Sequence, residues 1–83
     1  MASDAGALAD RLRSLRLPAD RTTTVVDLSS VESLTEPEAL ALVRAERRFR
    51  ANGRPLVVVH TSPAVRRQLV ALGLLSLVRR PRP

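Results

Sequence analysis

Cysteine, tryptophan, tyrosine and lysine are all missing from this 83-residue chain, and Phe49 is its only aromatic residue. Without cysteine there is no disulfide framework and no thiolate metal site, so the fold must depend on its apolar core. No apolar run approaches the roughly 20 residues that span a bilayer, and the first residues lack the basic start and apolar centre of a signal peptide. We therefore expect a cytoplasmic protein without membrane insertion.

The length and composition bound the architecture. Eighty-three residues allow one small domain and exclude a two-lobed enzyme with a cleft between the lobes. With 45% hydrophobic and 27% charged residues, the chain falls in the range of ordinary globular proteins. We expect a single domain over residues 1–78 and a disordered basic tail over residues 79–83.

The positive charge of the chain comes entirely from arginine, and the formal net charge is +6. Nucleic-acid binding needs basic residues gathered on one surface, usually together with aromatic side chains on which bases stack. Here the arginines are spread over every predicted helix, and a single aromatic residue is present. This distribution favours solvated helix faces. We therefore do not expect nucleic acid as a partner, although a small basic nucleic-acid-binding protein stays an alternative interpretation.

Hydrophobic periodicity predicts the first helix and two strands. Leucines recur at helical spacing across residues 3–16, where Ser3 would cap the helix. Residues 22–28 are rich in β-branched side chains, and residues 56–59 form an apolar run bounded by turn signals. Two adjacent valines in the first of these segments indicate a strand that is buried on both faces.

Two further helices have well-specified starts. Thr35 followed three residues later by Glu38 is a capping-box pattern with a proline in the first turn, and this helix should run to about Ala51. Ser62, which directly precedes another proline, caps the next helix.

The helix after Ser62 is expected to bury Val65, Leu69 and Leu72 and to leave Gln68 pointing outward. Residues 74–78 are apolar enough for a short helix or a final strand.

The alternation of helices and strands predicts an α/β fold with a small, mostly parallel sheet. The loops that follow the strands, residues 29–36 and residues 60–63, then lie at the same edge of that sheet. In open α/β sheets this edge is where partners or ligands engage.

The residues that catalysis would require are sparse. His60, the only histidine, stands at the end of a strand without a cysteine, which favours a hydrogen-bonded structural role. Asp27 and Glu36 could form a carboxylate pair, but no nucleophile with an orienting base accompanies them. The three glycines are isolated, so there is no phosphate-binding loop. The sequence predicts no catalytic residue, no metal site, no cofactor and no enzyme.

Three segments together resemble a STAS domain, the fold of bacterial anti-sigma factor antagonists. They are residues 25–31 (VVDLSSV), residues 50–56 (RANGRPL) and residues 62–74, which begin SPAVRR. The resemblance covers residues 22–78 in the order and spacing of the family. It implies a non-enzymatic protein-interaction domain in the regulation of bacterial transcription, bound typically by an anti-sigma factor that is also a serine kinase.

The chain departs from the family pattern in two places. The family usually has a strand or hairpin before the first helix, so we expect an N-terminally truncated, STAS-like sheet that lacks this first strand or hairpin. The resulting unpaired edge could recruit a second copy and form a homodimer. At the start of the second helix the family reads Asp-Ser-X-Gly, with the serine as phosphoacceptor, whereas this sequence has Thr35, Glu36, Pro37 and Glu38.

Glu36 therefore occupies the position equivalent to the phosphoacceptor, and Thr35 that of the aspartate. A glutamate there supplies a permanent charge, smaller than the roughly −1.5 to −2 of phosphoserine, which would mimic the phosphorylated state that releases a kinase partner. Alternatively, Glu36 complements the helix dipole while Thr35 caps the helix. Helix capping accounts for both Thr35 and Glu36 without any regulatory role. We therefore favour the interpretation that these residues stabilise the start of the helix over the interpretation that Glu36 mimics phosphoserine.

The regulatory loop is expected to contain Asp27, Ser33 and Thr35, with Asp27 accepting backbone N–H bonds in the 29–33 loop and Ser33 serving the turn. The expected partner-binding residues are Ser29, Ser30, Thr35, Glu36, Glu38, Thr61 and Ser62.

The expected partner is an anti-sigma factor or a serine kinase-type regulator. The alternative implied by the same resemblance is an accessory subunit of a lipid-transport ABC system, which small free-standing STAS-like proteins also serve.

Overall fold

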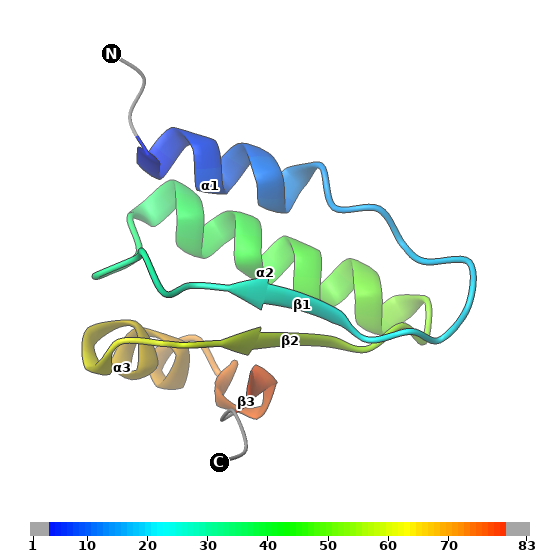
Figure 1. Cartoon of the computed structure of the whole chain (residues 1–83). Helices are drawn as coiled ribbons and strands as arrows, with labels where there is room; N and C mark the ends of the chain where they lie inside the picture. Colours follow the sequence, from blue (N-terminus) through cyan, green and yellow to red (C-terminus); the bar gives the residue numbers. More distant parts are fainter. Residues whose placement is uncertain (1–3, 80–83) are drawn as a thin grey trace.

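The computed structural model describes residues 4–79, and three helices alternate in it with short strands (Figure 1). The elements in chain order are α1 (Asp4–Arg13), β1 (Thr24–Asp27), α2 (Glu36–Ala51), β2 (Leu56–Val59), α3 (Pro63–Ala71), the 3₁₀ turn η1 (Leu75–Leu77) and β3 (Val78–Arg79). Residues 74–78, for which the sequence allowed either a short helix or a final strand, thus contain both, η1 followed by the start of β3.

The three strands form one parallel sheet in the order β1-β2-β3. Val26 pairs with Val58, and Val58 pairs on its other side with Val78. Helices α2 and α3 are the connections between successive strands, as parallel pairing requires. The predicted α/β class with a small parallel sheet is confirmed.

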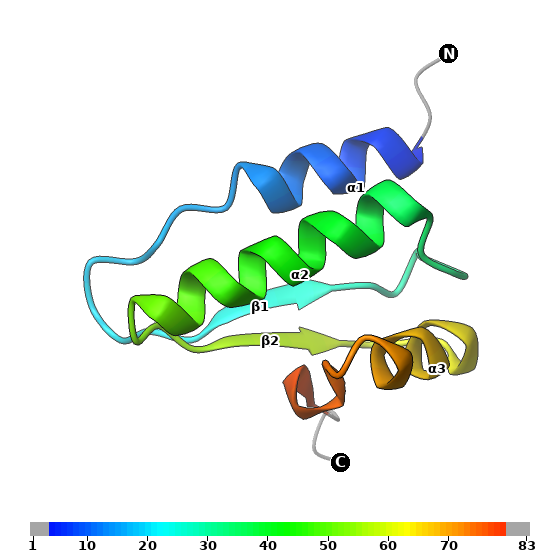
Figure 2. The ribbon, with the colours of Figure 1, turned by 180° about the vertical axis from the view of Figure 1, so that it is seen from behind.

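The core lies between this sheet and all three helices. Val26 and Val58 are register partners and therefore point to the same face, where they join one buried cluster with residues from α1, α2 and α3. Phe49 and Leu42 of α2 are 0% exposed at its centre. Both views show α1 and α2 side by side along one side of the β1–β2 pair (Figures 1 and 2).

Strand β1 is not buried on both faces as its sequence predicts. Its side chains alternate, with Val26 buried and Val25 56% exposed. The reason is its position at the edge of the sheet, since β1 has only β2 as a neighbour among residues 4–79. The apolar run of β2, which lies between two strands, is buried as expected.

Helix α3 also differs from its predicted stripe. Val65 and Leu69 are fully buried, but Leu72 is 39% exposed because the helix ends at Ala71 and the chain turns away. Gly73 makes this turn at φ +74°, in the left-handed region that favours glycine. Gln68 does not point outward but binds the 29–35 loop, as described below.

The first helix is shorter than predicted and ends at Arg13 rather than at residue 16, while the predicted cap Ser3 lies outside the described residues. Arg48, near the C-terminal end of α2, and Arg54, which follows α2, hold the loop after α1. Arg48 donates to the carbonyl of Leu15, and Arg54 Nε donates to that of Pro18 at 2.9 Å. These tertiary contacts hold the loop that stands in place of the last predicted turn of α1.

At the C-terminal end, Arg79 belongs to β3 and pairs with Val59, although it was expected to begin the tail. The rest of the expected tail, residues 80–83, lies outside the described residues. Between residues 4 and 79, no helix is both long enough and apolar enough to cross a membrane.

Candidate functional site

The loops that follow β1 and β2 meet at one end of the sheet. The parallel register continues beyond the strands, because Leu28 N donates to Val59 O at 3.0 Å. Ser62 Oγ then donates to Glu32 O at 2.7 Å, which joins the two loops directly. The expected common edge is therefore present. We call this end of the molecule, residues 27–36 and 60–63, the rim.

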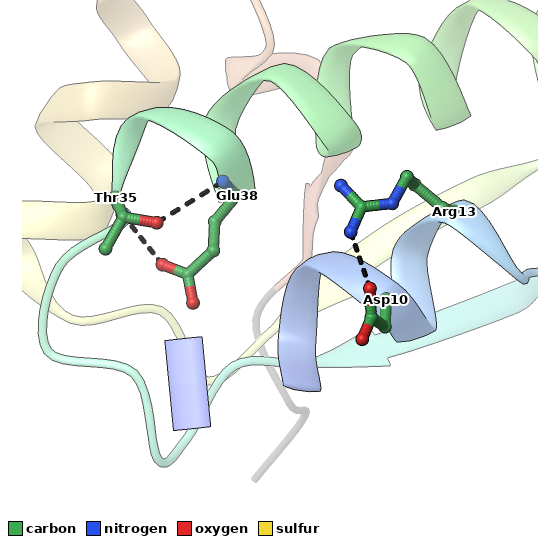
Figure 3. A network of polar contacts seen from close by, with 4 residues as sticks. All are labelled: Asp10, Arg13, Thr35 and Glu38. Carbon is green, nitrogen blue, oxygen red and sulfur yellow. Dashed lines mark hydrogen bonds and ion pairs between the residues drawn. The ribbon is translucent and has the colours of Figure 1, made fainter. Parts of the chain in front are cut away.

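The start of α2 is a complete capping box (Figure 3). Thr35 Oγ1 accepts from Glu38 N at 3.4 Å, and Glu38 Oε1 accepts from Thr35 N at 2.7 Å. Glu38 is only 3% exposed, so its carboxylate is buried beneath the loop. The predicted cap is confirmed. Thr35 and Glu38 thus fix the end of the loop, and Thr35 is exposed there whereas Glu38 is not.

Glu36 is the first residue of α2 and is exposed. Its carboxylate stands where the helix dipole favours a negative charge. A shallow groove beside it is lined by Arg13 of α1 and by Leu40 and Arg44 of α2. Arg13 makes an exposed ion pair with Asp10 at 2.5 Å (Figure 3). Glu36 is the acidic side chain that a partner approaching the α2 N-terminus would meet.

Asp27 closes the turn after β1. Its Oδ1 accepts from Ser29 N at 2.8 Å, as the sequence predicts. Hydrogen bonds from Ser29, the backbone one first, hold the pKa of the Asp27 carboxyl below its ordinary value, and the charge of His60 acts in the same direction. His60 follows β2 at φ +58°, the only non-glycine residue between 4 and 79 with a positive φ. Such backbone strain clusters at functional sites.

Ser62 and Gln68 fasten the 29–35 loop to α3. Ser62 Oγ caps α3 by accepting from Val65 N at 3.0 Å while donating to Glu32 O. Gln68 Nε2 donates to Leu34 O at 2.9 Å, and Gln68 Oε1 accepts from Leu34 N at 2.8 Å. This two-point bond, which we call the Gln68 clamp, makes the loop and the helix one rigid unit.

The Gln68 clamp is the feature of the rim that the sequence prediction missed. The available signal was the position of Gln68 one residue before the buried Leu69 and three after the buried Val65, at the border of the apolar stripe. An uncharged amide at such a border can both donate and accept, as a loop backbone requires. The clamp joins residues 34 positions apart, so no local sequence pattern predicts that Gln68 binds Leu34.

The remaining predicted partner-binding residues lie at the same end. Ser29 and Ser30 are exposed, and Thr61 is half-buried with its carbonyl accepting from Arg66. Ser30, Ser33 and Thr35 line one side of a hollow whose other side is Arg11 of α1. The structure thus brings the predicted site residues to the rim, except Glu38, which lies inside α2 with its side chain buried against Thr35 and is not open to a partner as predicted.

The segment that forms most of the rim is acidic in sequence within a basic chain. Residues 22–43 contain Asp27, Glu32, Glu36 and Glu38 and no arginine, although the whole chain carries +6. Arginines of neighbouring elements, Arg11 and Arg13 of α1 among them, border the rim. Others serve the fold, since Arg48 and Arg54 bind backbone carbonyls. No group of three metal-ligating side chains occurs among the residues that the structure describes.

The chain is thus a small parallel α/β domain in which two loops are joined into one polar rim. A family model described as "Mlab, STAS domain" matches residues 1–79, and the chain belongs to the STAS domain family. STAS domains are in general regulatory and interaction domains. Searches of curated proteins and of solved structures found no match.

Proposed function

We propose that this STAS domain docks an anti-sigma factor or a related regulatory kinase through its rim, in the cytoplasm of a bacterium. The observation that carries the proposal is the set of hydrogen bonds that fixes the exposed rim. The capping box, the Ser62–Glu32 bond and the Gln68 clamp hold the 29–36 loop without help from a partner. A preorganised surface loses less entropy on binding, so more of its contact energy becomes affinity.

Glu36 replaces the phosphoacceptor serine in this proposal, so serine phosphorylation at that position does not control binding. Thr35 Oγ1 is engaged as the cap acceptor, which makes it a poor substitute acceptor for a phosphoryl group. After incubation with a cognate kinase, the intact mass should therefore be unchanged. A gain of one phosphoryl group on Thr35 would contradict this part of the proposal.

The docking surface itself is tested by a pair of matched substitutions. Ser30 is exposed on the rim, and Ser14 is exposed at the end of α1. Ser30→Arg should weaken the binding of a purified anti-sigma kinase by tenfold or more, since a bulky charge in an interface costs at least about 1.4 kcal/mol. Ser14→Arg, with the same change in size and charge, should bind normally. If the two variants bound the kinase with equal affinity, the rim would not be part of the interface.

A second candidate function is favoured by the family description, which names Mlab. In this alternative the rim docks a subunit of a lipid-transport ABC system. The two candidates separate by purification from a host that expresses the neighbouring genes. Co-purification with membrane subunits supports the transporter, whereas a one-to-one complex with an ATP-binding regulator supports the first proposal. Nucleic-acid binding would instead show an affinity that falls steeply with the logarithm of the salt concentration.

A further inference from the structure

The structure gathers six arginines at the end of the molecule opposite the rim. Four lie at the C-terminal end of α2 and in the turn after it, and two lie in the loop after α1: Arg47, Arg48, Arg50, Arg54, Arg16 and Arg21. The two segments meet because Arg48 donates to Leu15 O and Arg54 to Pro18 O. Both lie at the far end of the strands from the rim (Figure 1). We call residues 14–21 and 47–54, whose single acidic residue is Asp20, the basic end.

The charge of the basic end is largely uncompensated. Arg48 and Arg54 bind carbonyl oxygens, which carry no net charge. Arg50 pairs with Glu46 at 3.5 Å, but the Arg50 side chain is 73% exposed, and ion pairs of exposed side chains are weak. The other three arginines are exposed and make no ion pair among residues 4–79: Arg16, Arg21 and Arg47. A positive surface therefore faces solvent and fits a partner that carries negative charges.

An exposed leucine among these arginines indicates which kind of anionic partner fits. Leu17 directly follows Arg16 and is 36% exposed. At the surface of a bilayer, arginines bind lipid phosphates while leucines enter the boundary between headgroups and acyl chains. Nucleic acid offers no such apolar layer, and the only aromatic residue on which its bases could stack, Phe49, is 0% exposed. The basic end therefore fits an anionic membrane better than a nucleic acid.

We propose that the basic end docks on a membrane that contains anionic phospholipid, with its arginines on the lipid phosphates and Leu17 in the interface. This binding is peripheral and needs no spanning helix. The rim, at the other end of the strands, then faces away from the bilayer and stays open to a protein partner. The inference is independent of the proposed function, because the basic end and the rim share no residue and vesicle binding needs no partner protein.

Sedimentation of the full chain with lipid vesicles tests this proposal. The wild type should bind vesicles made of phosphatidylglycerol and phosphatidylcholine in equal amounts, and should not bind vesicles of phosphatidylcholine alone. Each basic residue near an anionic membrane contributes about fivefold to the affinity. Arg16→Glu/Arg47→Glu, which reverses two exposed charges of the basic end, should therefore weaken binding by at least about 100-fold.

A matched variant separates the basic end from the net charge of the chain. Arg11→Glu/Arg67→Glu makes the same change at two exposed arginines that line hollows beside the rim. It should bind within about tenfold of the wild type, because charges are screened over only about 8 Å at physiological salt. Circular dichroism verifies that both double variants are folded. An equal loss of binding in the two double variants, or a wild type that does not bind the charged vesicles, would overturn the proposal.

Leu17→Ser distinguishes a membrane from other anionic partners, since this variant keeps every charge. It should weaken binding to the charged vesicles several-fold and leave binding to duplex DNA unchanged. Vesicle binding that Leu17→Ser does not change would contradict docking on a membrane. So would a wild type that binds duplex DNA more tightly than the charged vesicles at the same concentration of phosphate, because the basic end would then be a nucleic-acid surface.

Discussion

The Gln68 clamp should carry a measurable part of the stability of this domain. Gln68→Ala removes the partner of both Leu34 N–H and Leu34 C=O. At about 1 kcal/mol net for each hydrogen bond, we expect a loss of about 2 kcal/mol. This loss is large for a domain of this size, because native domains are stable by only roughly 0.05–0.15 kcal/mol per residue.

The assay is urea unfolding followed by far-ultraviolet circular dichroism, since the chain has no tryptophan for fluorescence. With a urea m-value on the order of 1–3 kcal/mol per molar, the midpoint should fall by about 1 M at an unchanged slope. The control is Arg67→Ala, an exposed neighbour on the same helix that receives the same alanine. If the two variants unfold at the same midpoint, the clamp contributes nothing and the reasoning fails.

A second substitution distinguishes the hydrogen bonds from simple packing. In Gln68→Glu the side chain keeps its size, but an ionised carboxylate cannot donate to Leu34 O and repels it. The pKa of the introduced carboxyl should therefore be raised by folding. The destabilisation should be present at neutral pH and should be relieved as the pH falls and the carboxyl becomes a donor. A pH-independent loss would assign the effect to packing.

Three further predictions concern the caps and the loops. Thr35→Ala should destabilise the domain by about 1 kcal/mol through loss of the α2 cap, and Thr35→Ser should restore most of this in the same urea assay. Folding lowers the pKa of Asp27, so its stabilising contribution is present above its unfolded pKa and is lost as the pH falls through the folded value. The difference in free energy of unfolding between the wild type and Asp27→Asn should accordingly disappear in acid. A difference that stayed the same at every pH would contradict this prediction. Arg54→Ala frees the carbonyls of Pro18 and Ala19, so trypsin should cleave after Arg16 and Arg21 faster than in the exposed control Arg47→Ala.

Much of the fold was predictable because its signals are local. Thr35 and Glu38 form the cap of α2, and Ser62 forms that of α3. Such bonds join residues three positions apart, so their pattern survives in any tertiary context. The order of elements then predicted the parallel sheet and, with it, the meeting of the two loops at one rim.

The errors occurred where burial depends on neighbours that are distant in sequence. Val25 and Val57 are both valines in apolar runs, yet Val25 is 56% exposed and Val57 only 9%. Their difference comes from strand order, because β1 is at the edge and β2 is in the middle. The length of α1 was also overestimated, and the loop in place of its last predicted turn is held by Arg48 and Arg54 from more than 30 positions away.

By itself, the sequence determined where α2 and α3 begin, which strands are parallel and which residues share the rim, because capping and strand polarity are properties of short segments. Only the tertiary structure decided that Gln68 locks the rim loop, that arginines hold the loop after α1, and that β1 presents an open apolar edge. Each of these depends on which segments become neighbours in space, and that is set by the packing of the whole chain around Phe49 and Leu42.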